Sequence, residues 1–86
     1  MRQEFELILG EEIRYLAIET RAQLDLTQKE MGKRLFMSES SYSDIETGVT
    51  VCASALTEAL LLKMQENPSI FLNRLAKRFE EALQPI

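Results

Sequence analysis

The sequence contains no histidine and no tryptophan, and its single cysteine is Cys52. One cysteine cannot form a disulfide within the chain, and without histidine it has no partner for a zinc site of the usual ligand spacing. No base stands beside Cys52, so we interpret it as a small buried side chain and not as a reactive thiol. We therefore expect no metal and no other cofactor, and a reduced, cytoplasmic setting.

Catalytic patterns are also missing. There is no glycine-rich phosphate loop, and the acidic pairs Glu11-Glu12 and Glu80-Glu81 are adjacent on expected helices, so their carboxylates point in different directions. These absences argue against an enzyme. No apolar run approaches the roughly 18 residues that a membrane span requires, and the acidic start MRQEFELILGEE does not resemble a signal peptide.

Proline and glycine are scarce, with two and three copies, which leaves no room for a flexible linker. We therefore predict one domain, residues 1–86. The net charge of −4 is unevenly spread: residues 1–12 hold one base and four acids, residues 13–48 five bases and six acids, and residues 49–86 four of each. An acidic chain argues against strong nonspecific binding to nucleic acid, so any DNA contact depends on where the five central bases point.

The apolar spacing predicts an all-α fold of five helices. A long helix from Glu4 to Leu24, which Gly10 could interrupt, carries Leu9, Ile13, Leu16 and Ala17 at helical intervals. The later helices are expected at Gln28–Leu35, at Glu39–Thr47, from Ser54 to about Gln65, and from Ser69 to about Leu83, where Asn67-Pro68 marks the start of the last and Pro85 its end. The β-branched stretch Val49–Ala53 has no second strand to pair with, so we predict a buried loop.

Residues 27–48 contain two short helices with clear boundary signals. Thr27 and Glu30 have the spacing of a capping box, Ser38 is a second N-cap, and Gly48 stands where a glycine ends a helix. The segment LTQKEMGKRLFMSESSYSDIETG closely resembles the helix-turn-helix of the Cro/phage-repressor family, also called Xre-like. The matching features are Thr27-Gln28 at the start, Gly32 at the helix crossing, Tyr42 and Ile45 as inward locks, the closing Ile45-Glu46-Thr47-Gly48, and Arg21 upstream.

The resemblance implies a DNA-binding transcription regulator whose second short helix enters the major groove. It implies that Glu39, Ser40 and Asp44 face base edges, that Ser43 lies near the backbone, and that Gln28 and Thr47 contact phosphates. We expect Thr27 and Lys29 to lie on the same DNA-facing surface, with Lys33 on the face of Lys29, Arg21 facing the DNA backbone, and Glu46 turned inward. Double-stranded DNA is then the expected partner and a homodimer the expected state.

Four positions depart from the family pattern. Phe36 replaces the glycine of the turn, which predicts a differently shaped turn, because a phenylalanine with positive φ is strained. Val49 stands where the family commonly has a base. Glu39 and Asp44 place acids on a recognition helix without lysine or arginine, so arginine cannot contact guanine, although carboxylates can accept from cytosine N4.

Two further alternatives stay open. The stripe Phe71, Leu75, Phe79 and Leu83 on the last helix, residues 69–83, is expected either to form a dimer interface or to cap the core of one chain. The acidic recognition helix and the apolar Val49–Ala53 loop also suit a second function: a protein-interaction module, antitoxin-like or antirepressor-like, that keeps the fold and has lost its affinity for DNA.

Overall fold

The computed structural model of the chain describes residues 1–51 and 53–84, and within them it contains five helices and no strand. The helices are α1 (Arg2–Gln23), α2 (Gln28–Arg34), α3 (Glu39–Thr47), α4 (Ala55–Lys63) and α5 (Ser69–Leu83). The prediction of an all-α fold with a long N-terminal helix is confirmed. The predictions for Cys52 and Pro85 concern residues outside this described part.

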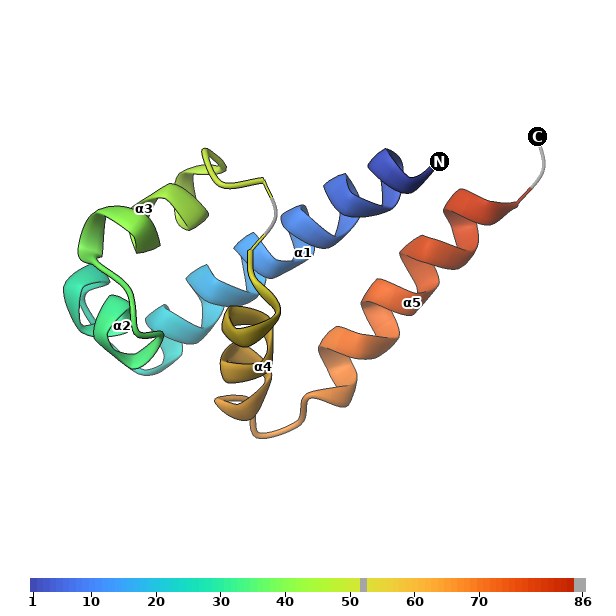
Figure 1. Cartoon of the computed structure of the whole chain (residues 1–86). Coiled ribbons are helices and arrows are strands. Elements are labelled where there is room, and N and C mark those ends of the chain that lie inside the picture. Colours follow the sequence, from blue (N-terminus) through green and yellow to red (C-terminus); the bar gives the residue numbers. More distant parts are fainter. Residues whose placement is uncertain (52, 85–86) are drawn as a thin grey trace.

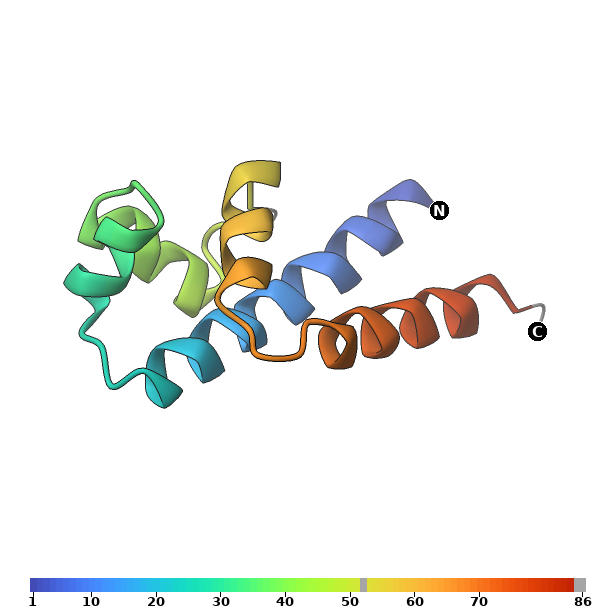
Figure 2. The ribbon, with the colours of Figure 1, turned by 90° about the horizontal axis from the view of Figure 1, so that it is seen from below.

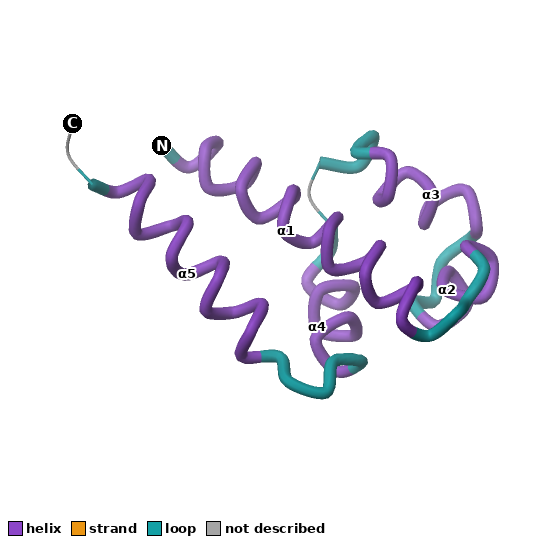
Figure 3. The backbone as a smooth tube through the Cα atoms, turned by 180° about the vertical axis from the view of Figure 1, so that it is seen from behind, coloured by secondary structure: helices purple, strands orange, loops and turns teal. Residues whose placement is uncertain are grey.

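The long helix α1 organises the molecule, because α3, α4 and α5 all contact it. Helix α5 runs antiparallel along the first half of α1, so the start of α1 and the end of α5 lie at the same end (Figures 1 and 2). Helices α2 and α3 pack on each other at the opposite end, and α4 lies between them and α5 (Figures 1 and 3). The two short helices are therefore well separated from the chain termini.

The core joins all five helices around one face of α1. Ile13, Leu16 and Ala17 recur at helical spacing on α1, so their side chains share the face that the other helices cover. The remaining buried members are Met31 from α2, Leu35 from the following turn, Tyr42 and Ile45 from α3, Leu61 from α4 and Phe71 from α5. The buried residues of all five helices therefore form one core.

The helix ends follow the predicted capping residues. The hydroxyls of Thr27, Ser38 and Ser54 each accept a hydrogen bond from the backbone N–H three residues later, which starts α2, α3 and α4. Helix α1 passes through Gly10 without interruption, and α4 ends at Lys63, before the predicted Gln65. Before α5, the side-chain oxygen of Asn67 accepts from the backbone N–H of Ser69 at 3.2 Å, but the residue at the N-cap position is Pro68, and no side chain caps this helix.

A buried carboxylate fastens α5 to α1. Glu12 accepts hydrogen bonds from Arg74 at 2.5 Å and from Arg78 at 2.9 Å. Nearer the termini, the rings of Phe5 and Phe79 meet edge to face with centroids 5.1 Å apart. Arg74 and Arg78 are four residues apart and share a helix face, but nothing in the sequence says which acid they meet. These ion pairs were therefore not predicted.

The prediction of a buried loop after α3 is wrong for residues 49–51, whereas Ala53 is partly buried and packs against the core. The side chains of Val49 and Val51 are 71% and 52% exposed, and Thr50 is exposed as well. The backbone packs inward instead: an added Cβ at Gly10 would lie 1.9 Å from the carbonyl oxygen of Val51. The close approach of the loop backbone to α1 turns both valine side chains toward solvent, which the apolar composition of the loop did not reveal.

We expect Gly10→Ala to destabilise the protein by about 1–2 kcal/mol, because the new methyl group must push the Val51 carbonyl away from α1. Helix propensity alone predicts the opposite, since alanine is favoured over glycine inside a helix by roughly 1 kcal/mol. Urea unfolding followed by circular dichroism measures the difference. Ala22→Gly, at an exposed position of the same helix, calibrates the propensity effect, and a stabilised Gly10→Ala variant would contradict the close packing.

Candidate nucleic-acid interface

The candidate interface is the two-helix unit, residues 27–48, which comprises α2, a turn and α3. Thr27 and Glu30 form both bonds of a capping box: the Thr27 hydroxyl accepts from the Glu30 N–H at 3.1 Å, and the Glu30 carboxylate accepts from the Thr27 N–H at 3.0 Å. The pKa of Glu30 is lowered, mainly by the hydrogen bond from the Thr27 backbone N–H and next by the Thr27 side chain. Gly48 ends α3 with φ of 84°. The predicted boundary signals are thus all used.

The turn between α2 and α3 passes close to α2. A Cβ on Gly32 would lie 3.0 Å from the carbonyl oxygen of Met37 and 3.1 Å from that of Ser38, so the small residue makes room for the turn backbone. Phe36 adopts φ of 59° in this turn. The turn therefore keeps the left-handed backbone conformation that a glycine favours at this position. The expectation that phenylalanine would reshape the turn is wrong.

Glu46 connects three helices from a buried position. Its carboxylate accepts from Arg21 at 2.6 and 3.1 Å and from the side-chain amide of Gln28 at 3.1 Å. The hydroxyl of Tyr42 also donates to it and contacts the carbonyl oxygen of Ala17 at 3.2 Å. The expectation that Glu46 turns inward is confirmed. Arg21 was expected to face the DNA backbone, but its guanidinium is bound to Glu46 instead.

The charges in this cluster stabilise one another. Burial alone raises the pKa of Glu46, but hydrogen bonds from Arg21, Tyr42 and Gln28 outweigh it, so the pKa is lowered. The hydrogen bond to Glu46 raises the pKa of Arg21. The pKa of Tyr42 is well above its usual value, mainly because the side chain is buried and next because of the carboxylate of Glu46. Glu46 is therefore ionised and Tyr42 neutral at physiological pH, which keeps the hydroxyl proton available for donation.

Arg14 of α1 also contacts this unit, and this contact was not predicted from the sequence. Its guanidinium donates to the backbone carbonyl oxygen of Glu46 at 2.7 Å, close to the end of α3. A cation near the C-terminus of a helix is stabilised by the free carbonyl groups there. The available signal was its position two helical turns before Arg21, which places both arginines on one side of α1.

The predicted base-facing side chains do lie on the outer side of α3. Glu39 and Ser40 are exposed, and Ser43 and Asp44 are half-buried. Thr47 is exposed, and its hydroxyl donates to the carbonyl oxygen of Ser43 at 3.0 Å, which leaves it as an acceptor toward any ligand. Two carboxylates on a short helix give this face an acidic and hydroxyl-rich character.

Helix α2 presents the cations of the unit. Lys29, Lys33 and Arg34 are exposed, and among the described residues none forms an ion pair within 4 Å. The predicted phosphate contact Gln28 is half-buried and spends one amide N–H on Glu46. Thr27 is exposed, but its hydroxyl oxygen already accepts in the capping box. The free positive charge thus comes from residues 29–34, of which Arg34 was not in the predicted site.

The apolar stripe on α5 mostly serves the fold of one chain. Phe71 belongs to the core, Leu75 packs against it, and Phe79 contacts Phe5. Leu83 alone of the four is exposed. Core capping, one of the two alternatives for this stripe, describes three of its side chains. Of the four, Leu83 alone is left exposed for contact with a second copy of the chain.

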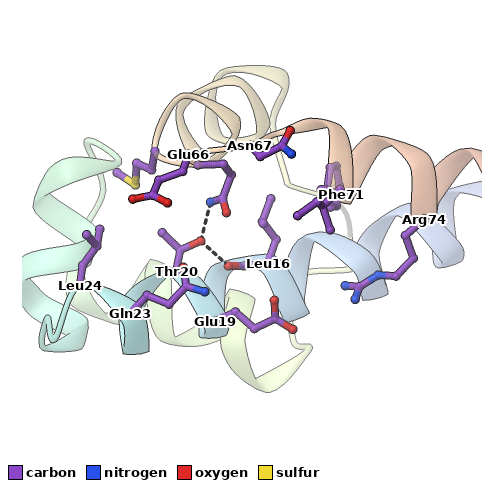
Figure 4. A pocket seen from close by; sticks show the side chains of 12 residues that line it. Leu16, Glu19, Thr20, Gln23, Leu24, Glu66, Asn67, Phe71 and Arg74 are labelled. Carbon is purple, nitrogen blue, oxygen red and sulfur yellow. Dashed lines mark hydrogen bonds between the residues drawn. The ribbon is translucent and has the colours of Figure 1, made fainter.

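A hollow of about 480 Å³ lies away from the two-helix unit, between α1 and the corner that joins α4 to α5 (Figure 4). At its floor, Gln65 donates to the Thr20 hydroxyl at 2.7 Å, and Thr20 donates to the Leu16 carbonyl oxygen at 2.6 Å. These bonds attach the corner to α1. Glu19 and Glu66 also line the hollow.

No family model matches the chain, and no curated protein or solved structure is significantly similar to it. Residues 1–51 and 53–84 contain no group of three acids, cysteines or histidines placed to bind a metal ion. None of the helices in the same residues is long and apolar enough to cross a membrane. The class that the structure defines is therefore an all-α domain, and its function rests on the geometry of the two-helix unit.

Proposed function

We propose that the chain is a sequence-specific DNA-binding transcription regulator of the phage-repressor type. The observation that carries this proposal is the way α3 is held: Tyr42 and Glu46 lock it from the inside, while a polar face points outward. A recognition helix must hold its side chains in register with base edges, and a helix fixed from within does so at little entropic cost.

The cations of α2 suit contacts with the phosphate backbone. Lys29, Lys33 and Arg34 are exposed and free of ion pairs within the described residues, so neutralising phosphates would break no existing contact. Each such contact releases counterions and makes affinity depend on salt. Three cations per chain are few, which favours binding as a homodimer on two half-sites about 34 Å apart.

The outer face of α3 suggests what the bases must offer. Carboxylates can only accept, so Glu39 and Asp44 suit the N4 amino group of cytosine. The hydroxyls of Ser40 and Ser43 can donate or accept and discriminate less. We therefore expect a site in which cytosines occur at the positions that α3 contacts, and no dependence on an arginine-to-guanine contact.

The test starts with selection of duplexes from a random pool by the full chain. Fluorescence polarisation then measures the affinity for a selected and for a scrambled duplex at about 50 and 200 mM salt. We expect preference for the selected duplex and weaker binding at higher salt. A folded chain that shows no salt-dependent binding to either duplex would exclude this function.

We expect the double variant Lys33→Gln/Arg34→Gln to reduce the slope of log affinity against log salt by about 2 per bound chain. The loss should be similar for selected and scrambled duplexes, because phosphate contacts carry no sequence information. Lys77→Gln, an exposed lysine on α5, is the matched control and should leave the slope unchanged. Equal slopes for all three proteins would show that Lys33 and Arg34 of α2 do not contact the phosphates.

A protein-interaction module is the second candidate, favoured by a specific observation. The acidic outer face of α3 borders a loop whose Val49 and Val51 side chains are exposed. Acidic and apolar groups together suit a basic, apolar protein surface better than phosphates. Pull-down from the native host followed by mass spectrometry tests it: a stoichiometric protein partner without DNA supports the module, and DNA without such a partner supports the regulator.

A further inference from the structure

Phe36 carries two costs that the fold does not require. Its φ of 59° lies in the left-handed region, where a bulky side chain is strained and glycine is not. Its ring is 80% exposed and does not belong to the hydrophobic core. A glycine at this position would relieve the backbone and remove an exposed apolar group. The phenylalanine is therefore not explained by folding.

The backbone around Phe36 is nevertheless well fixed. The N–H of Phe36 donates to the Lys33 carbonyl oxygen at 3.2 Å, and the N–H of Met37 donates to that of Gly32 at 2.9 Å. Ser38, two residues further on, caps α3. The Phe36 backbone is thus fixed two residues before the N-cap of α3, and this end of a recognition helix is the one that approaches the bases.

The surroundings of Phe36 favour DNA over a protein partner. Anchors in protein interfaces usually sit within an apolar patch that excludes water. Here the chain neighbours Leu35 and Met37 are buried or half-buried, and the exposed side chains nearest in the sequence are Lys33, Arg34, Ser38 and Glu39. An isolated ring between two cations and a polar helix end fits a surface of phosphates and base edges better than an apolar protein patch.

We propose that Phe36 contacts the 5-methyl group of a thymine in the major groove and so determines specificity at one position. This inference rests on the proposed DNA-binding function and names a contact within it. A phenyl ring forms no conventional hydrogen bond, and the thymine methyl is the apolar group that the major-groove edges offer. The contact supplies apolar discrimination to a helix whose own side chains are acids and hydroxyls.

The test compares the wild type with Phe36→Gly on the duplex that the wild type selects, and on copies in which each thymine in turn is replaced by deoxyuridine. We expect Phe36→Gly to raise Tm by a few degrees and to weaken binding about four- to tenfold. One deoxyuridine substitution should weaken wild-type binding about fourfold, the value of one buried methyl group, and should not affect Phe36→Gly. Leu72→Ala, at an exposed apolar residue of α5, is the control and should bind like the wild type.

Several results would overturn the proposal while leaving the DNA-binding function intact. Equal affinities of wild type and Phe36→Gly would do so, as would weaker binding by Phe36→Gly without any wild-type sensitivity to deoxyuridine. A lowered Tm of Phe36→Gly would show that the fold needs the ring, and an unchanged Tm would show that the ring costs the fold no stability. Loss of a protein partner with unchanged DNA affinity would assign the ring to a protein interface. A wild-type protein that binds no duplex would instead contradict the proposed DNA-binding function itself.

Discussion

Replacing Tyr42 by alanine is expected to destabilise the protein by about 3–5 kcal/mol, the usual cost of truncating a buried aromatic side chain. The Tyr42 ring is fully buried between α3 and α1, and its hydroxyl donates to Glu46. An 86-residue domain typically has a total stability of about 4–13 kcal/mol, so the variant would lose much of it. Urea unfolding followed by circular dichroism measures the loss.

Tyr42→Phe is the matched control, because it keeps the ring and removes only the hydroxyl. It should cost about 1–2 kcal/mol, since the lost hydrogen bond joins a charged partner. The difference between the two variants separates packing from hydrogen bonding. If alanine and phenylalanine cost the same, the ring does not pack as described and α3 is held by polar contacts alone.

We expect Glu46→Ala to destabilise the protein by about 2–3 kcal/mol. Removing one partner of a buried ion pair commonly costs about 3–5 kcal/mol, because the other charge stays behind without compensation. Here Arg21 keeps 29% of its side-chain surface in solvent, which reduces the penalty. Gln28 and Tyr42 also lose their acceptor. Denaturant unfolding at neutral pH measures the effect, and Glu39→Ala, an exposed acid on the same helix, should change stability by less than about 0.5 kcal/mol.

The effect of Glu46 should depend on pH in a defined direction. Its pKa is lower in the folded protein than in the unfolded chain, so its contribution is present above about pH 4.3 and is lost as the pH falls through the folded value. The difference in stability between wild type and Glu46→Ala should therefore shrink on acidification below that pH. A difference that stays constant down to about pH 2 would show that Glu46 acts by packing and not by charge.

The helices could be predicted because their boundaries depend on local chemistry. Thr27 with Glu30, Ser38, Ser54 and Gly48 each satisfy free backbone groups within one helical turn, so neighbouring residues suffice to place them. The inward position of Glu46 was also foreseen, although only through the resemblance to a family. The outward position of Glu39 and Ser40, which the structure shows as exposed, was expected through the same resemblance.

Other features depend on contacts between distant segments. The loop 49–51 was expected to be buried because its residues are apolar, but the approach of its backbone to Gly10 decides which way they point. Arg14 and Glu12 find partners 32 and more than 60 residues away, and no local pattern encodes such pairs. Phe36 keeps a left-handed turn despite its side chain, because the surrounding hydrogen bonds fix the backbone.

The contrast between the two faces of α3 is central to the proposed function. The inner face is a closed network in which Tyr42, Glu46 and Arg21 satisfy one another, whereas the outer face offers acids and hydroxyls that are not needed for the fold. The outer face and the cations of α2 are therefore the surfaces through which the proposed binding to DNA would act.

The most direct test is a titration of the isotope-labelled chain with a duplex that it selects, followed residue by residue in proton–nitrogen correlation NMR spectra. We expect shifts at Lys29, Lys33 and Phe36 and along residues 39–47, with α5 residues such as Lys77 unaffected. A folded chain whose spectrum stays unchanged at saturating duplex, or whose shifts are confined to α5, would contradict the proposal that α2 and α3 form a DNA-binding surface.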